Sequence, residues 1–191
     1  ERAHQQYLDD GLTLPAVRCA AWIVMNLAIR GEIGPATGWL GRAQRLIADE
    51  GECAERGWLL IPSVFQREAA GEFAAAAAVA GEAVSLGERF GDRDLFAVAV
   101  QAQGYMLLKS GQVREGLGLL DEGMVAVTAE ELSPIVTGIV YCGVILACQE
   151  VFEVRRAREW TRALGDWWAL QPEMVAFTGR CLVHRAEILQ L

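Results

Sequence analysis

The sequence has few of the residues that usually build catalytic or metal sites. It contains two histidines and five cysteines in 191 residues, and no cysteines form a CxxC pair. The odd number and the spacing do not indicate a disulfide framework or a zinc site. We therefore expect the cysteines to behave as small apolar residues in a reducing cytoplasm, and we expect no metal or other cofactor.

Long hydrophobic runs and lysine are also scarce. The longest apolar stretch, Ile135 to Cys148, has 14 residues, whereas a membrane-spanning helix needs about 20. It therefore predicts a buried helix and no contact with a membrane. Lys109 is the only lysine among 17 basic residues, and 25 acidic residues give a net charge of −8. Because such a chain repels phosphate backbones, we expect DNA binding only through a domain outside this chain.

Two further patterns are missing. Alternating apolar and polar runs bounded by turn pairs do not occur, so the sequence predicts no strands. A GxxxxGK[ST] loop, which holds nucleotide phosphates through its backbone amides, is also missing. The sequence therefore offers no phosphate-binding motif of its own.

Glycine, by contrast, is frequent and regularly spaced. One series recurs every 20 residues, at Gly11, Gly31, Gly51, Gly71, Gly91 and Gly111. Twenty residues correspond to a helix of about 17 residues and a short turn, where glycine can adopt the left-handed conformation that ends a helix. The spacing predicts pairs of helices with a period of about 40 residues and turns centred on these glycines.

The second helices of these pairs begin with related segments. These segments are "GEIGPATGWLGRA" at 31, "GEFAAAAAVAGEA" at 71, "GQVREGLGLLDEG" at 111 and "FEVRRAREWTRAL" at 152, of which the last has slipped by one residue and lost its glycine. Small residues share one position in the four copies, which predicts a close approach of two helices there: Ala36, Ala76, Gly116 and Ala157.

The segments between these copies predict the first helix of each pair. They cover 13–30, 53–70, 93–110 and 133–151, and the last begins with a serine cap, Ser133, followed by Pro134 at the first helical position. Helix pairs of this kind bury their apolar faces by stacking on their neighbours. We therefore predict an all-α solenoid of antiparallel helix pairs over 1–191, with repeats at about 12–51, 52–91, 92–132 and 133–171 and partial units at 1–11 and 172–191.

This pattern resembles the tetratricopeptide repeat, which has small and bulky apolar residues at fixed positions around a turn glycine. The third copy supplies Gly104, Leu107, Gly111, Gly116, Leu120 and Gly123, and the first supplies Leu27, Gly31, Ala36, Leu40 and Ala43. The period of about 40 is longer than the 34 residues of that family, and its signature tryptophan, tyrosine and closing proline are mostly missing.

The longer unit is similar to the divergent repeats of large actinobacterial regulators of the LuxR or MalT-like kind, most of all over 159–191. In those proteins a repeat region lies between an ATP-binding module and a helix-turn-helix domain. The resemblance implies that this chain is a fragment of a transcriptional regulator. The alternative is a tetratricopeptide-like scaffold of another multi-domain signalling protein.

The concave groove of such solenoids is lined by the first helix of each pair. Carrying the spacing across gives the candidate groove residues Arg18, Met25, Trp58, Phe65, Glu68, Gln101, Tyr105, Cys142 and Gln149. A mixture of aromatic and polar side chains suits a protein segment or a small effector. Several of these residues are equally compatible with core positions, because the register of a divergent repeat can slip by one residue.

Other candidates favour structural roles, and we expect no enzymatic activity. His184 has Cys181 and Glu187 on the same helix, which is too few ligands for a metal. The neighbouring carboxylates Asp121 and Glu122, and likewise Glu130 and Glu131, point in different directions on a helix. Four arginines form a basic cluster: Arg155, Arg156, Arg158 and Arg162. Arg155, Arg158 and Arg162 share one helical stripe, which could bind an anion or an acidic partner surface but is more typical of an exposed helix face, since Glu159 can pair with Arg155.

The two ends of the chain read as halves of further repeats. Residues 1–10 predict the second helix of a preceding pair, and 172–191 predict a first helix whose partner is missing. This last helix has too many apolar residues for one face: Met174, Val175, Phe177, Leu182, Val183, Ile188 and Leu189. We expect them to form an apolar patch that supports self-association in this fragment, as a homo-oligomer.

Overall fold

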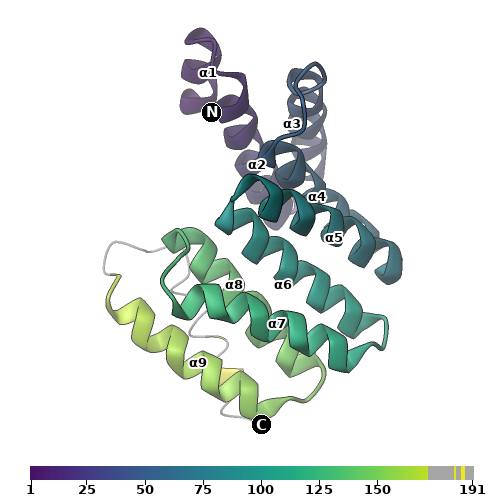
Figure 1. The fold of residues 1–191 in the computed structure, drawn as a ribbon, viewed down its shortest axis with the longest axis vertical. Coiled ribbons are helices and arrows are strands. Elements are labelled where there is room, and N and C mark those ends of the chain that lie inside the picture. Colours follow the sequence, from purple (N-terminus) through teal and green to yellow (C-terminus); the bar gives the residue numbers. More distant parts are fainter. Residues whose placement is uncertain (172–182, 184–185, 188–191) are drawn as a thin grey trace.

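The computed structural model describes residues 1–171, 183, 186 and 187. Over these residues the fold is all-α, as the sequence predicts, with nine helices and no strand (Figure 1). The helices are α1 (Arg2–Asp9), α2 (Thr13–Ile29), α3 (Ile33–Leu46), α4 (Ala54–Ala69), α5 (Phe73–Phe90), α6 (Arg93–Lys109), α7 (Val113–Thr128), α8 (Pro134–Glu150) and α9 (Val154–Ala169).

The helices pack in chain order. We name α2, α4, α6 and α8 the A helices and α3, α5, α7 and α9 the B helices. The bounds of the A helices agree with the prediction to within one residue at each end. Each A helix contacts the B helix that follows it, and successive A helices also contact each other (Figure 1). The A helices therefore form a continuous layer through the molecule.

Glycines end the helices at most of the predicted turns. Five members of the 20-residue series have a φ between 64° and 87°: Gly11, Gly31, Gly71, Gly91 and Gly111. This left-handed conformation is easily reached by glycine, because it has no Cβ atom to clash with the following carbonyl oxygen. The predicted role of these five glycines is confirmed.

Gly51 differs from the other members of the series. The expected tight turn is a longer loop here, and Gly51 has no left-handed φ. The guanidinium group of Arg56 donates hydrogen bonds to the carbonyl oxygens of Ile47, Glu50 and Gly51, at 2.6 to 3.0 Å. Because a side chain satisfies these carbonyl groups, the loop does not need a left-handed residue to close the helix.

The slipped fourth copy keeps the turn conformation without its glycine. Phe152 has a φ of 59° in the turn between α8 and α9, and Glu130 has a φ of 55° in the turn after α7. Both conformations are strained for residues that carry a Cβ atom.

Small residues allow the helices of a pair to approach closely. A Cβ atom on Gly104 would lie 2.8 Å from the carbonyl oxygen of Gly116, and one on Gly116 would lie 2.6 Å from that of Gly104. The equivalent residues Ala36, Ala76 and Ala157 are buried, as predicted. These contacts set the distance between paired helices.

Helix α8 starts at the predicted residue, but the Ser133 side chain does not cap it as expected. Pro134 is the first helical residue and Ser133 is the N-cap, yet the Ser133 side chain forms no capping hydrogen bond. Its backbone N–H instead donates to Oδ1 of Asp94 at 2.9 Å. The acid at the start of α6 thereby holds the start of the next A helix.

The first helix is attached by a buried histidine. In α1, His4 is 1 % exposed, and its Nδ1 donates to the carbonyl oxygen of Ala16 at 2.8 Å. Its ring meets the Trp39 ring edge to face, with 4.9 Å between centroids.

The apolar patch expected over 172–191 falls almost entirely outside the described residues. None of the described helices combines the length and apolar character that crossing a membrane requires.

Candidate functional site

The candidate groove residues all lie on the A helices, but they differ in exposure. Phe65 is 48 % exposed, whereas Trp58, Gln101, Tyr105 and Cys142 are at most 8 % exposed. The remaining candidates are partly exposed: Arg18, Met25, Glu68 and Gln149. The buried ones occupy core positions, which is the alternative that the sequence left open.

The first group of candidates meets where three A helices begin. Nη2 of Arg18 in α2 lies 2.8 Å from Oε1 of Glu55 in α4 and 2.6 Å from Oδ2 of Asp92. The same Asp92 oxygen accepts a hydrogen bond from Nε1 of Trp58 at 3.0 Å. The guanidinium carbon of Arg18 lies 5.2 Å from the centre of the Trp58 ring, within the range of a cation–π contact. We name these four residues the Arg18 cluster.

Asp92 holds its place in this cluster through the start of α6. It is the N-cap of that helix, and its Oδ1 accepts a hydrogen bond from the Leu95 N–H at 2.9 Å. The cap fixes one oxygen and leaves the other for Arg18 and Trp58. The side chains of Glu55 and Asp92 are only 13 % and 12 % exposed, so the two carboxylates interact strongly with the single cation.

A second group lies where three A helices end. Nζ of Lys109 in α6 is 3.3 Å from Oε1 of Glu68 in α4 and 3.6 Å from Oε2 of Glu150 in α8. The hydroxyl of Tyr105 donates to Oε1 of Glu150 at 2.6 Å. Lys109 also lies over the Tyr105 ring, 4.9 Å from its centre. We name these four residues the Lys109 cluster.

Burial and hydrogen bonding suppress the ionisation of Tyr105. Burial raises the pKa of its phenol above the ordinary value, and the hydrogen bond to Glu150 raises that pKa further. The phenol therefore stays a hydrogen-bond donor over the physiological pH range.

The two clusters have the same composition of charges. Each holds one cation and two carboxylates, and these three groups come from three different A helices or their N-caps.

The remaining candidates lie apart from the clusters. Gln101 is packed against α8, where a Cβ atom on Gly143 would lie 2.4 Å from its amide nitrogen. The amide nitrogen of Gln149 donates to Oε2 of Glu187 at 3.2 Å. Phe65 follows Trp58 by seven residues and therefore lies on the same side of α4. We call the surface that carries both clusters, Met25 and Phe65 the A-helix face.

Sequence reasoning missed four members of the clusters: Glu55, Asp92, Lys109 and Glu150. The available signal is the separation of opposite charges by about one repeat. Arg18 and Glu55 are 37 residues apart, as are Glu52 and Arg89. Successive A helices contact each other, so opposite charges at this separation can pair between them or near their ends.

The other candidates lie outside the A-helix face. Arg156 pairs with Asp121 at 3.0 Å, and Glu131 lies 3.6 Å from Arg93. Arg155, Arg158 and Arg162 are exposed. His184 and Cys181 fall outside the described residues. Within the described part of the chain, no group of histidine, cysteine and acidic side chains could hold a metal ion.

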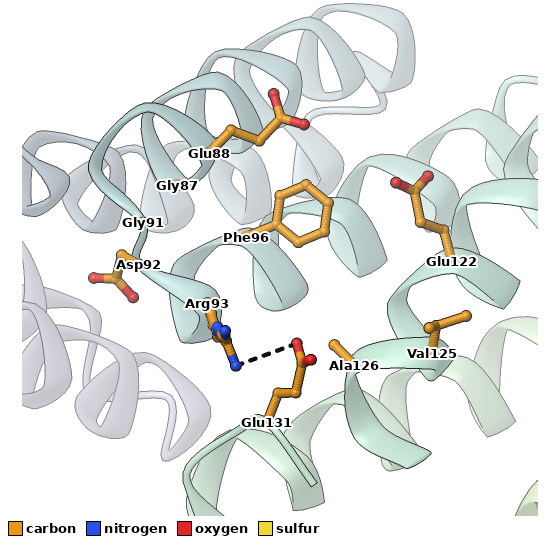
Figure 2. A pocket seen from close by; sticks show the side chains of 10 residues that line it. All are labelled: Gly87, Glu88, Gly91, Asp92, Arg93, Phe96, Glu122, Val125, Ala126 and Glu131. Carbon is orange, nitrogen blue, oxygen red and sulfur yellow. Dashed lines mark ion pairs between the residues drawn. The ribbon is translucent and has the colours of Figure 1, made fainter. Parts of the chain in front are cut away.

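A pocket of about 420 Å³ lies elsewhere, between α5 and α7 (Figure 2). It is formed by the end of α5, the first turns of α6 and the second half of α7. Acidic side chains surround its apolar floor, and Arg93 lies at its edge, paired with Glu131. It shares only Asp92 with the Arg18 cluster.

Comparisons with known proteins do not assign this arrangement to a family. No protein-family model, no curated protein and no solved structure matches the chain.

Proposed function

We propose that this chain is a non-catalytic repeat module that binds a protein segment or a small effector, and that it belongs to a larger transcriptional regulator of the LuxR or MalT-like kind. The module is an α-solenoid of tetratricopeptide-like helix pairs in this proposal. The observation that carries it is the layer of A helices, in which two clusters each join three successive helices.

The A-helix face has the chemistry of a recognition surface. Phe65 stands 48 % exposed on a helix whose other large apolar side chains are mostly buried. Each cluster near it carries one more carboxylate than cations. An exposed aromatic side chain beside excess negative charge suits a ligand that combines apolar and basic groups.

Peptide selection tests the binding surface. A display library is selected against residues 1–191, and the affinity of the enriched peptide is measured for the Phe65→Ser variant. We expect about a tenfold loss, since exposed aromatic anchors contribute more than 1 kcal/mol to such surfaces. The matched control is Ile33→Ser, which removes an exposed apolar side chain from the B helix α3. Equal effects of the two variants would contradict the assignment of the A-helix face.

The regulator context needs a separate observation. The polypeptide encoded by the intact gene is expected to contain an ATP-binding module before these repeats and a helix-turn-helix domain after them. Different flanking domains would favour the scaffold of another signalling protein. The binding surface is tested separately, by the peptide selection and the Phe65→Ser variant.

A further inference from the structure

An aromatic side chain that takes no part in the hydrophobic core lines the pocket between α5 and α7. The Phe96 ring points into this pocket, between Glu88 of α5 and Glu122 of α7 (Figure 2). Phe96 is partly exposed and is not among the side chains that pack against the hydrophobic core. The ring face is therefore available to a ligand that enters the pocket.

A close contact between α5 and α6 beneath the pocket explains why the Phe96 ring is not covered by α5. A Cβ atom on Gly87 would lie 2.7 Å from the backbone nitrogen of Phe96. The end of α5 can therefore lie directly on the backbone at the start of α6, and the Phe96 side chain extends past it. Val125 of α7, which is 65 % exposed, forms an apolar wall of the same pocket.

Two of the four carboxylates around the pocket are paired with other described side chains, and two are not. Asp92 is committed to Arg18 and Trp58, and Glu131 faces Arg93. Among the described residues, the carboxylates of Glu88 and Glu122 form no ion pair or hydrogen bond, and both residues are exposed. Two uncompensated negative charges thus stand beside an accessible aromatic ring.

We propose that this pocket is a second binding site, and that it takes an arginine side chain from an extended basic segment of a partner protein. The guanidinium group would stack on Phe96 and bind the Glu88 and Glu122 carboxylates, while neighbouring apolar atoms of the segment contact Val125. The volume of about 420 Å³ lies in the range of small-ligand sites, about 300 to 1,000 Å³. It leaves room for the backbone around the arginine.

The charges favour arginine over other occupants. A guanidinium group is planar and weakly hydrated, so it stacks on a ring and binds carboxylates with two parallel hydrogen bonds. An acidic ligand would be repelled by Glu88 and Glu122, and a neutral one would bury them without a partner. The net charge of −8 also attracts basic segments over longer distances.

This site differs from the A-helix face of the proposed function. Phe96 precedes Tyr105 by nine residues, which is two and a half helical turns, so the two side chains point to opposite sides of α6. Binding at one surface can therefore be lost without loss of binding at the other.

The test uses a capped pentapeptide, Gly-Ala-Arg-Ala-Gly, and its lysine and citrulline counterparts, titrated into residues 1–191 at low salt and followed by NMR. We expect the arginine peptide to bind most tightly and the uncharged citrulline peptide most weakly. Phe96→Leu keeps an apolar side chain and removes the ring face, which should weaken arginine binding about three- to fivefold. Glu88→Gln combined with Glu122→Gln should weaken it about fivefold.

The matched controls are Phe65→Leu on the A-helix face and Glu82→Gln, an exposed glutamate of α5 outside the pocket. Neither should change the affinity. Equal binding of the arginine and citrulline peptides, a Phe96→Leu affinity equal to wild type, or no spectral shift at millimolar peptide would overturn the proposal. So would weakening by Phe65→Leu alone, because the peptide would then occupy the A-helix face.

Discussion

Arg18 and Asp92 are 74 residues apart in the sequence, and their side chains form an ion pair of 2.6 Å. One is in the second turn of α2 and the other caps α6, so the contact reaches across the A helix that lies between them. Glu55 of this middle helix accepts a hydrogen bond from the same arginine nitrogen. A single guanidinium group therefore links three successive A helices.

We predict that Asp92→Ala destabilises the protein by about 3 kcal/mol. It removes a helix cap, worth about 1 kcal/mol, leaves the Trp58 N–H without its acceptor in a buried site, and leaves Arg18 with Glu55 as its only carboxylate partner. Asp92→Asn should cost about half as much, since an asparagine oxygen still caps the helix. The free energy of unfolding from urea titrations, compared with the exposed substitution Glu82→Gln, measures both. Equal stability of Asp92→Ala and Glu82→Gln would show that the Arg18 cluster contributes nothing.

The helix pair α4 and α5 provides a test of packing. Ala76 is fully buried, so Ala76→Leu should overpack the pair and reduce stability by about 1 to 3 kcal/mol. Ala75 is its exposed neighbour on the same helix, and Ala75→Leu should change stability by less than about 0.5 kcal/mol. Chemical denaturation of the two variants distinguishes them, and coinciding midpoints would mean that this part of the repeat alignment is wrong.

The turn between α8 and α9 should be easy to stabilise. Phe152 holds a φ of 59° with its side chain 79 % exposed, so Phe152→Gly relieves strain and loses little packing. We expect a gain of about 1 kcal/mol, seen as a higher melting temperature. In the equivalent turn, Gly111→Ala should lose a similar amount, since φ is 87° there. A Phe152→Gly variant less stable than wild type would contradict the assigned conformation.

Stability should fall steeply at alkaline pH. Burial raises the pKa of the Cys148 thiol to about 11 from its ordinary value near 9, and it also raises that of Tyr105. Above about pH 9 the unfolded chain releases these protons while the folded chain retains them, so the free energy of unfolding decreases as pH rises. Cys148→Ala should flatten this decrease between pH 9 and 11. An unchanged slope in that variant would exclude the thiol as a cause.

The helices could be predicted from the sequence because their signals are local. The 20-residue glycine spacing predicted the A helices to within one residue, and the alignment of the four related segments marked Ala76 as a contact between helices. The Arg18 and Lys109 clusters have no such signal, because each joins side chains of different A helices, which meet only after the helices pack. The Gly51 loop escaped prediction for a different reason: Arg56 is close in the sequence, but the glycine spacing does not indicate that its side chain will satisfy the carbonyl groups of Ile47 and Gly51.

The sequence pattern also could not predict which side chains of an A helix are exposed. Trp58 and Phe65 are seven residues apart on one side of α4, yet one is fully buried and the other half exposed. The difference comes from Trp22 of α2, whose ring lies 5.2 Å from that of Trp58, and from Asp92, which accepts its N–H. Neither neighbour can be identified from the spacing within α4.

Hydrogen exchange of residues 1–191 with and without the tightest peptide from the display selection tests the central proposal, that the A-helix face is a binding surface. Bound peptide protects backbone amides near its contacts and stabilises the elements it joins. We predict slower exchange in α4 and α6, over the segments that contain Phe65 and the Lys109 cluster, and little change in α3. Protection confined to the B helices α3, α5 and α7, with α4 unchanged, would contradict the account.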